Sequence, residues 1–588
     1  MQTEIFSYND EQFADLQMLR YKVDGFEQLS ISRKKLIYYL SEAALSGRDI
    51  LWDQNGKYNL LIRKTLESIY TDYTGNRESE EFKAFTVYLK RVWFSNGIHH
   101  HYGCEKFKPE FSKTFFLEAF RNLPADKLPL ENGQTAEELC KMLVTIIFCP
   151  EVMPKRVNQT DGEDLVTTSS CNYYGEGLTQ AEAESFYNTM KQENNTHPVM
   201  YGMNSRLVKN GEKTVEKVWK SGGLYGAAID RIVYWLEKAA NTAENKKQAE
   251  VINKLIEFYR TGDLRTFDEY TILWVQETEA LVDFTNGFTE TYGDPLGLKA
   301  SWEGYVNFKD TEATARAEKL SANAQWFEDH SPVDERFKKQ TCRGVSAKVI
   351  KAAILGGDLY PASAIGINLP NSNWVRAEYG SKSVTIGNLT EAYNKAAHGN
   401  GFHQEFVVDE ETIQMLEQYQ DICDDLHTDL HECLGHGSGK LLPGIDSDAL
   451  KSYGSTIEEA RADLFGLYYL ADPKLTELEL TPNAEAYKAQ YYSYMMNGLL
   501  TQMVRIEPGQ DIEEAHMRNR ALIAHWAYEH GAKEHITELI QRNGKTYIRI
   551  HDYEKLRQLF GVLLREIQRI KSEGDYIAAR KLVEQYGV

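Results

Sequence analysis

Apolar residues recur every three or four positions over long stretches of this chain, which is the spacing of one face of an α-helix. The pattern predicts helices over residues 136–148, 227–240, 248–260, 412–430, 484–503, 513–530 and 553–572. Shorter runs of β-branched and aromatic residues predict strands over 214–219, 382–386, 402–408 and 546–551. Residues 157–177, rich in Thr, Ser, Asp and Asn, predict a long surface loop. The pattern therefore indicates an α+β protein that is mostly helical.

Length and charge narrow the class of protein. A chain of 588 residues exceeds one compact core, so we expect two lobes separated by a wide cleft that holds the site. The formal net charge of −21 argues against a nucleic-acid partner, because no basic stripe offsets the acidic excess. Basic peptides, or peptides with a free amino end, suit this charge better.

Cysteine usage and the N-terminus bear on the compartment. Seven cysteines, an odd number without a C-x-x-C pair, fit reduced thiols in a cytoplasm better than a disulfide framework. No signal peptide is visible, and no stretch approaches the ~18 apolar residues of a membrane span. We expect a soluble cytoplasmic protein with no membrane partner, although a chain that starts after a removed signal segment would look the same.

The most informative motif is His431-Glu432-Cys433-Leu434-Gly435-His436. In the zinc signature H-E-x-x-H the two His lie about 40° apart on an α-helix and share one metal ion. The extra residue here widens the angle to roughly 140°, so a shared ion requires a bulge or a tightened turn near the second His. Gly435 permits this because, without a Cβ, it tolerates strained backbone angles. Glu432 follows the first His and faces the open position of such an ion.

An acidic cluster close behind offers a third metal ligand, which zinc in a hydrolytic site requires. Ser455 predicts the N-cap of a new helix, with Glu458 as its capping-box partner. Glu459 and Asp463 lie four residues apart, so one helix face offers a carboxylate for the metal and one that holds a His ring. An acidic first turn also complements a helix dipole, but its proximity to the His pair favours a metal site.

Both motifs resemble those of the dipeptidyl peptidase III family, zinc exopeptidases marked by H-E-x-x-G-H and a downstream E-E-x-R-x-[ED]. Cys433 resembles the bacterial members, and Asp463 stands where the family more often has Glu. The resemblance implies His431, His436 and Glu459 as ligands of one Zn²⁺ ion, Glu432 as the general base, and Glu458 and Asp463 as the groups that orient the imidazoles.

Further segments in the same order extend the resemblance over most of the chain. Residues 290–295, with Glu303 downstream, resemble an E-x-Y-x-D-P segment. This implies that Glu290 receives the free amine of the substrate and that Tyr292 helps stabilise the tetrahedral intermediate. Taken alone, the Asp-Pro pair in this segment also reads as an ordinary turn.

The remaining segments imply contacts with the peptide. Asn368 and Asn371 lie in a stretch that resembles I-N-[IL]-P-N and are implied to bind the N-terminal dipeptide. His516 and Arg520 lie in an H-M-x-x-R stretch, with His516 implied at the scissile carbonyl and Arg520 at the peptide backbone. Arg580 is a weaker match to a basic pair on a late strand that approaches the cleft. An Arg four residues after a His is also common on a helix surface, so the order of the segments favours function more than any one segment does.

The resemblance implies a mixed lobe with a small β-barrel core and a helical zinc lobe. We place the mixed lobe at 1–310, with 352–402 and 580–588 returning to it, and the helical catalytic lobe at 311–351 and 403–579. Family members usually continue past the equivalent of Val588. If the full protein ends there, we expect a late part of one lobe to be missing; if a terminus was trimmed or cleaved, we expect a second fragment to complete it.

Two other His patterns compete for a metal. His427 and His431 form H-x-x-x-H, which we interpret as a decoy because no Glu after its first His leads on to a flexible Gly. His99, His100 and His101 are consecutive, and consecutive side chains point in different directions, so they do not readily share one ion. We expect a loop that lines the cleft, with Tyr102 against substrate; a plain surface loop and a second metal are the alternatives.

The residues themselves are suited to peptide hydrolysis. Glu432 takes a proton from the attacking water and returns it to the leaving amine, while His516 and Tyr292 donate to the developing oxyanion. Two extended residues span about 7 Å, so Glu290 at that distance from the metal selects dipeptide release from an unblocked N-terminus. The alternatives are a zinc endopeptidase without an amine clamp and a peptide-binding protein without turnover. We expect a monomer that acts on short peptides.

Overall fold

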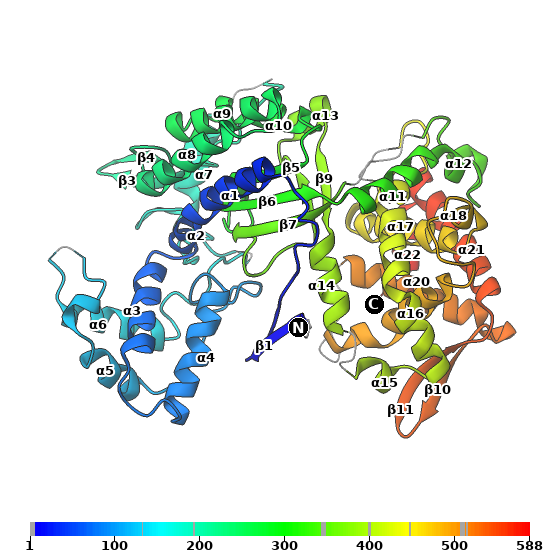
Figure 1. The fold of residues 1–588 in the computed structure, drawn as a ribbon, viewed down its shortest axis with the longest axis horizontal. Coiled ribbons are helices and arrows are strands. Elements are labelled where there is room, and N and C mark those ends of the chain that lie inside the picture. Colours follow the sequence, from blue (N-terminus) through cyan, green and yellow to red (C-terminus); the bar gives the residue numbers. More distant parts are fainter. Residues whose placement is uncertain are drawn as a thin grey trace. The chain divides into compact units, whose positions relative to one another are not determined.

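The computed structural model describes residues 6–131, 133–160, 162–191, 195–342, 348–397, 401–445, 449–505, 512 and 515–587. The chain divides into two compact units, which we name by their content. The helical unit comprises Met1–Tyr8, Asp310–Val349 and Thr390–Val588, and the mixed unit comprises Asn9–Lys309 and Ile350–Leu389. The colours of Figure 1 follow the sequence and show that each unit is assembled from more than one stretch of the chain.

These units differ from the predicted lobes at two stretches. Residues 580–588 belong to the helical unit, because α22 (Tyr576–Tyr586) packs against α20 (Ala515–Gly531) and α21 (Tyr553–Glu573). The chain from Thr390 onwards belongs there as well, where Lys395 forms an ion pair of 2.8 Å with Asp421. The predicted return of both stretches to the mixed lobe is therefore wrong.

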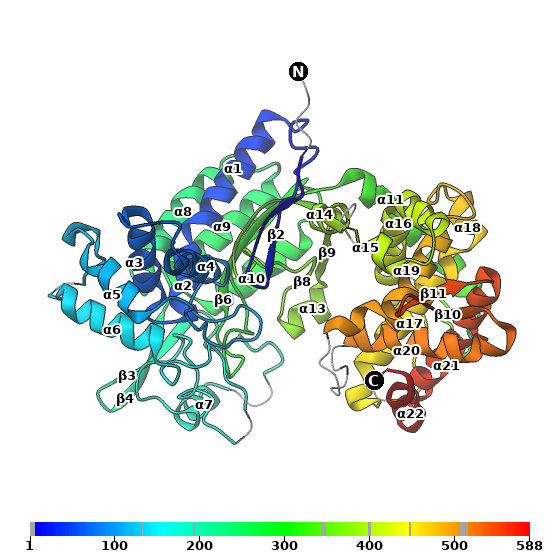
Figure 2. The same ribbon diagram turned by 90° about the horizontal axis from the view of Figure 1, so that it is seen from below.

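Helix α17 (Gly454–Leu470) is the central helix of the helical unit. Apolar residues lie on nearly all its sides, which is the pattern of a buried helix, and only a short polar stretch interrupts them. It packs against α16 (Glu410–Leu430), α19 (Tyr487–Leu499), α20 and α21, and Figure 2 shows it among these helices. The other elements of this unit are α11 (Thr311–Ala322), α12 (Ala324–Asp329), α14 (Gly387–Ala397), α15 (Phe402–Phe406), α18 (Pro473–Glu477), β10 (Thr537–Arg542), β11 (Lys545–Ile550) and the short helical turns Glu335–Phe337, His431–Gly435, Lys451–Tyr453, Thr501–Arg505 and Ala532–Glu534.

A five-stranded sheet in the order β5-β6-β7-β9-β8 lies at the centre of the mixed unit. Helices α1 (Ile31–Ser46) and α2 (Arg48–Asn55) pack against it, and α1 runs along the sheet in Figure 1. Its strands are β5 (Val282–Glu290), β6 (Ser301–Lys309), β7 (Lys348–Gly357), β8 (Gly366–Leu369) and β9 (Lys382–Ile386). The other elements of this unit are β1 (Asn9–Phe13), β2 (Leu16–Leu19), α3 (Asn59–Asp72), α4 (Glu80–Phe94), α5 (Lys113–Arg121), α6 (Ala136–Phe148), α7 (Gln180–Asn188), β3 (Ser205–Asn210), β4 (Lys213–Val218), α8 (Gly226–Ala240), α9 (Lys246–Thr261), α10 (Leu264–Gln276), α13 (Asn373–Tyr379) and the turn Ala125–Lys127.

The predicted β-barrel core is wrong, because this sheet is open. Strands β5 and β8 form its two edges, and no pairing joins them among the residues that the structure describes. A barrel closes only when each edge strand pairs with the other, and β8 offers four residues to the nine of β5. The mostly helical α+β class is confirmed.

The hydrophobic pattern located most elements correctly, and α6 has the predicted bounds. Residues 402–408 are not a strand, because Phe402 and Phe406 lie on one face of the short helix α15 with ring centroids 4.7 Å apart. The predicted loop at 157–177 contains no helix or strand in its described part, but its end is not at the surface, since Tyr173 is buried and its hydroxyl lies 3.0 Å from Ser301 Oγ. Throughout the described chain, every helix is too short or too polar to cross a lipid bilayer.

Candidate metal centre

The first zinc motif lies where α16 changes into a π turn, His431–Gly435. The amide N–H of His436 donates to the carbonyl oxygen of His431 at 3.1 Å, a hydrogen bond that spans five residues instead of four. The wider turn returns His436 to the face that carries His431, and the two ring centroids lie 4.7 Å apart. The predicted helix distortion at the second His is therefore confirmed.

Gly435 is required for a different reason from the predicted one. Its backbone does not adopt the left-handed conformation, so conformational freedom is not what it contributes. A Cβ at this position would lie 2.9 Å from both Cα and the carbonyl oxygen of Ala462. Glycine is needed because the π turn contacts the backbone of α17 directly.

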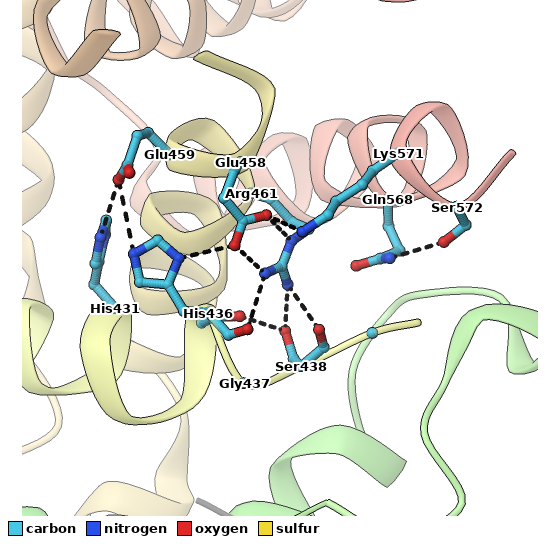
Figure 3. Close-up of polar contacts among 12 residues, drawn as sticks. His431, His436, Gly437, Ser438, Glu458, Glu459, Arg461, Gln568, Lys571 and Ser572 are labelled. Atoms are coloured by element: carbon cyan, nitrogen blue, oxygen red, sulfur yellow. Dashed lines mark hydrogen bonds and ion pairs between the residues drawn. The ribbon is translucent and has the colours of Figure 1, made fainter. Parts of the chain in front are cut away.

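Three side-chain atoms converge beside this turn, as Figure 3 shows. Glu459 Oε2 lies 3.3 Å from His431 Nε2 and 3.8 Å from His436 Nε2. Ligands about 2.0–2.1 Å from a tetrahedral zinc ion stand about 3.3–3.4 Å from one another, which is close to these separations. Glu432 lies beside the same two imidazoles, since one of its carboxylate oxygens and one nitrogen of each ring all lie within 4.8 Å of one another.

Glu459 Oε2 provides a test of whether the residues fit a metal ion. This atom is buried, and among the described residues only imidazole nitrogens approach it, none of them in good hydrogen-bonding geometry. A buried carboxylate oxygen without a partner is costly unless an ion or water satisfies it. Two imidazole nitrogens and a carboxylate oxygen are the donor set of hydrolytic zinc sites, so the residues present fit zinc.

The ring of His431 is fixed by Asp463. His431 Nδ1 donates to Asp463 Oδ1 at 2.7 Å, and the buried hydroxyl of Tyr494 donates to Asp463 Oδ2 at 2.8 Å. Burial opposes ionisation of Asp463, but the hydrogen bond from His431 and the charges of His431 and His427 outweigh burial and hold the pKa of Asp463 below its usual value. The shorter Asp therefore reaches its imidazole. Tyr494 lies about thirty positions away in sequence, and nothing in the motif pointed to it.

The ring of His436 is fixed by Glu458, which is itself held by two cations. His436 Nδ1 donates to Glu458 Oε1 at 2.8 Å. Arg461 donates to Oε1 at 2.7 Å and to Oε2 at 3.0 Å, and Lys571 also donates to Oε2. Arg461 is fully buried and reaches Ser438 Oγ at 2.6 Å, so it ties Glu458 to the chain just after the metal motif. Sequence reasoning missed Arg461 and Lys571, although Arg461 stands inside the acidic motif, three residues after Glu458.

Helix α17 begins one residue before Ser455, which corrects the predicted N-cap. The 3₁₀ turn Lys451–Tyr453 runs directly into the helix, and the N-cap position, Tyr453, makes no side-chain capping bond. Glu458 is therefore occupied by His436 and the cations instead of a capping box.

Of the other predicted residues in the helical unit, His516 lies beside the proposed metal ligands and Arg580 does not. His516 Nδ1 is 3.6 Å from Glu459 Oε2, and its side chain is 60% exposed. Arg520, one turn further along α20, places its guanidinium over the ring of Tyr494 at 5.8 Å. Arg580 lies on helix α22 and not on the predicted strand, and its exposed side chain pairs with Glu584 at 3.1 Å.

In the mixed unit the predicted substrate residues gather at the end of β5. Asn371 Nδ2 donates to Glu290 Oε2 at 3.1 Å and to the Thr289 carbonyl at 3.2 Å. Tyr292 is 79% exposed, and the charge of Glu290 beside it, together with partial burial, raises the pKa of Tyr292. Asn368 is exposed on the edge strand β8.

Three carboxyl groups lie close together there. Glu303 is buried on β6, and burial together with the charges of Glu290 and Asp358 raises its pKa well above the usual value. Burial also raises the pKa of Glu290 and of Asp358. Glu303 Oε1 has no hydrogen-bond partner among the described residues. Asp358 was not predicted, because only the sheet brings it near the other two.

The competing His patterns have structural explanations. His427 hydrogen-bonds from Nε2 to the Asp463 carbonyl oxygen and accepts from Gln490 at Nδ1, both at 3.2 Å. His99 is buried against the Met153 carbonyl at 2.8 Å, whereas His100 accepts the amide of Gly103 at 3.0 Å. The rings of His100 and His101 stack with centroids 4.5 Å apart. The three His are therefore held by local contacts, one of which joins His100 to His101.

Comparison with known proteins decides the family. A model of peptidase family M49 matches residues 189–450 and 445–588. The chain belongs to peptidase family M49. The predicted resemblance to the dipeptidyl peptidase III family is thereby confirmed, as is the predicted enzyme class of metallo dipeptidyl-peptidase.

This M49 peptidase is similar to dipeptidyl peptidase 3 of Homo sapiens, with 25% identity over 96% of the chain and 85% of that protein. It is 25% identical to dipeptidyl peptidase 3 of Rattus norvegicus over 86% of the chain and 76% of that protein. The solved structure of DPP III from Caldithrix abyssi shares its fold, with a TM-score of 0.69 and 20% identity over 96% of this chain and 91% of that one.

Proposed function

We propose that this M49 peptidase releases dipeptides from the unblocked N-terminus of oligopeptides and uses one zinc ion bound by His431, His436 and Glu459. The observation that carries the proposal is the approach of both Nε2 atoms to Glu459 Oε2, at 3.3 and 3.8 Å, with that oxygen buried and otherwise unsatisfied. A zinc ion in this position supplies electrophilic activation of the peptide carbonyl and of a water molecule.

The protein's own residues then handle the protons and the developing charge. Glu432 takes the proton of the attacking water and delivers it to the leaving amine. His516 donates a hydrogen bond to the carbonyl oxygen as it becomes an oxyanion, with Tyr292 as the second proposed donor, and Arg520 contacts the peptide. Asp463 and Glu458 hold the two imidazoles in the orientation that ligation needs.

The N-terminal ammonium is recognised by carboxylates of the mixed unit. Glu290, Glu303 and Asp358 repel one another in a buried setting, and a cation that enters the group relieves this repulsion. Asn371 fixes Glu290, and Asn368 offers an exposed amide on the edge strand for the dipeptide backbone. A charge-assisted bond of this type discriminates against blocked N-termini.

A pair of peptides that differ only in N-terminal acetylation tests the proposal. We expect one bound zinc per chain and dipeptide release from the free peptide, with acetylation lowering kcat/KM by about 10²-fold or more. Equal cleavage of both peptides at internal bonds would identify an endopeptidase without an amine clamp. Binding without cleavage of either would identify a peptide-binding protein. Glu432→Gln is the matched control, because it should retain zinc and lose turnover.

A further inference from the structure

A cavity of about 700 Å³ opens beside His436 and Glu459 in the helical unit. Its walls include the first turn of α17 and the end of α21. Four lysines line it, from three different segments of the chain: Lys339, Lys440, Lys451 and Lys571. We call this the lysine cavity. Such a concentration of cations is unexpected in a chain with a net charge of −21.

Buried charged groups fix the walls of the lysine cavity. Glu328 is buried and accepts the backbone N–H of Lys339 at 2.6 Å and that of Gly439 at 3.0 Å, which joins two of the lysine-bearing segments. Arg461, also fully buried, donates to Ser438 Oγ at 2.6 Å and to the Ser438 carbonyl at 3.1 Å. The cavity is therefore a formed site and not a gap between mobile surface chains.

The charges in the cavity are only partly balanced. Lys571 donates to Glu458, whose charge is shared with Arg461, and Lys339 Nζ donates to the Gly437 carbonyl. No carboxylate within the described ranges pairs with Lys440 or Lys451; the Lys451 ammonium lies 5.1 Å from the centroid of an aromatic ring. The first turn of α17, which has no side-chain cap, adds its own positive end. An arriving anion would find unused donors.

The lysine environment is repulsive for a further cation. Burial lowers the pKa of Lys571, and the neighbouring charges of Arg461 and Lys339 lower it further. A peptide has one end of each sign, and its N-terminal ammonium would be repelled here. The part of a substrate that enters this cavity must therefore be neutral or negative.

We propose that the lysine cavity binds a carboxylate of the peptide substrate on the C-terminal side of the cleaved bond. The inference rests on the proposed function for the placement of the peptide, because His436 and Glu459 line the same cavity. The carboxylate comes from the free C-terminus of a short peptide or from an acidic side chain next to the cleaved bond. Short or acidic-ended oligopeptides are then the preferred class of substrate.

Calorimetry with the full-length, zinc-loaded Glu432→Gln protein tests this without turnover. The first pair of probes is tetra-alanine and its C-terminal amide; the second is an amidated hexa-alanine with glutamate or glutamine as its third residue. We expect the carboxylate member of at least one pair to bind about tenfold more tightly, and the ratio to shrink as salt is raised. A preference confined to the first pair identifies the terminal carboxylate, and one confined to the second identifies the side chain.

The double variant Lys440→Gln/Lys451→Gln should lower the ratio of affinities between the carboxylate probe and its neutral partner to below about twofold. The control double variant Lys533→Gln/Lys555→Gln removes two lysines of the same unit that do not line the cavity, and should keep the tenfold ratio. Equal affinity of both members in both pairs, or a ratio that survives the Lys440/Lys451 change, would overturn the inference. Failure of the wild-type protein to release dipeptides would refute the proposed function. The affinity ratios would still test the lysine cavity, because they are measured without turnover.

Discussion

Replacement of Arg461 by methionine should loosen the metal centre without changing the side chain of any proposed ligand. Arg461 is fully buried and donates five hydrogen bonds of 2.6–3.4 Å, two to Glu458, two to Ser438 and one to the His436 carbonyl oxygen. Methionine has a similar length and cannot donate, so the Glu458 carboxylate loses half of its cationic partners. Removing one partner of a buried ion pair costs about 3–5 kcal/mol, and we expect the lower end because Lys571 remains.

Hydrogen exchange read from peptides of α17 and α21 measures this loss locally, which suits a chain of two units that need not unfold in one step. A cost of about 3 kcal/mol corresponds to about 10²-fold faster exchange in the metal-free protein. Because Glu458 holds the ring of His436, competition with a chelator should also show zinc affinity lower by about 10–100-fold.

Arg569→Met is the matched control. Arg569 lies on α21 and pairs with three carboxylates at 2.7–3.0 Å, and each of these carboxylate side chains is about one third exposed or more. Exposed pairs contribute about 1 kcal/mol or less, so exchange should change less than about fivefold and zinc affinity not at all. If Arg461→Met matched this control in both measurements, the argument that Arg461 supports Glu458 would be refuted.

Four other outcomes follow from the geometry. Gly435→Ala should destabilise the helical unit by about 1–3 kcal/mol and weaken zinc binding, because the new Cβ meets the α17 backbone at 2.9 Å; unchanged metal content after dialysis would contradict this. Glu432→Gln should retain zinc by elemental analysis and lose about 10²–10⁴-fold in kcat, and wild-type turnover would remove Glu432 from the mechanism. Tyr494→Phe should lower zinc affinity by about tenfold, because Asp463 loses a donor, with chelator competition as the assay. Glu290→Gln should narrow the difference in kcat/KM between free and acetylated peptides, and an unaltered ratio would exclude Glu290 as the amine clamp.

The spacing of the two His in the sequence predicted the main feature of the metal centre, the distortion of the helix between them. Because His436 lies five positions after His431, an ideal helix cannot bring both to one ion, and the structure contains the π turn that resolves the conflict. The reason for Gly435 could not be predicted, since it depends on how closely another helix approaches. The expected cap at Ser455 was wrong because a preceding 3₁₀ turn starts the helix early, which a local pattern does not reveal.

The partners that hold the site were harder to foresee than the site itself. Lys571 and Tyr494 reach the motif from other helices, and only tertiary packing brings them there. Asp358 joins Glu290 through the sheet. Arg580 was assigned by position in a family pattern and lies on a helix, so a short basic match at the end of a chain was too weak to fix its structure.

Helix α17 presents Glu458, Glu459 and Asp463 from fewer than two turns and is enclosed by other helices on nearly every side. A stiff rod of this kind keeps the spacing among the three carboxylates constant, whatever small motions it undergoes. A shift of α17 along its contact with α16 would instead displace all three carboxylates from both imidazoles at the same time. The centre is therefore assembled or dismantled as a whole, and not one ligand at a time.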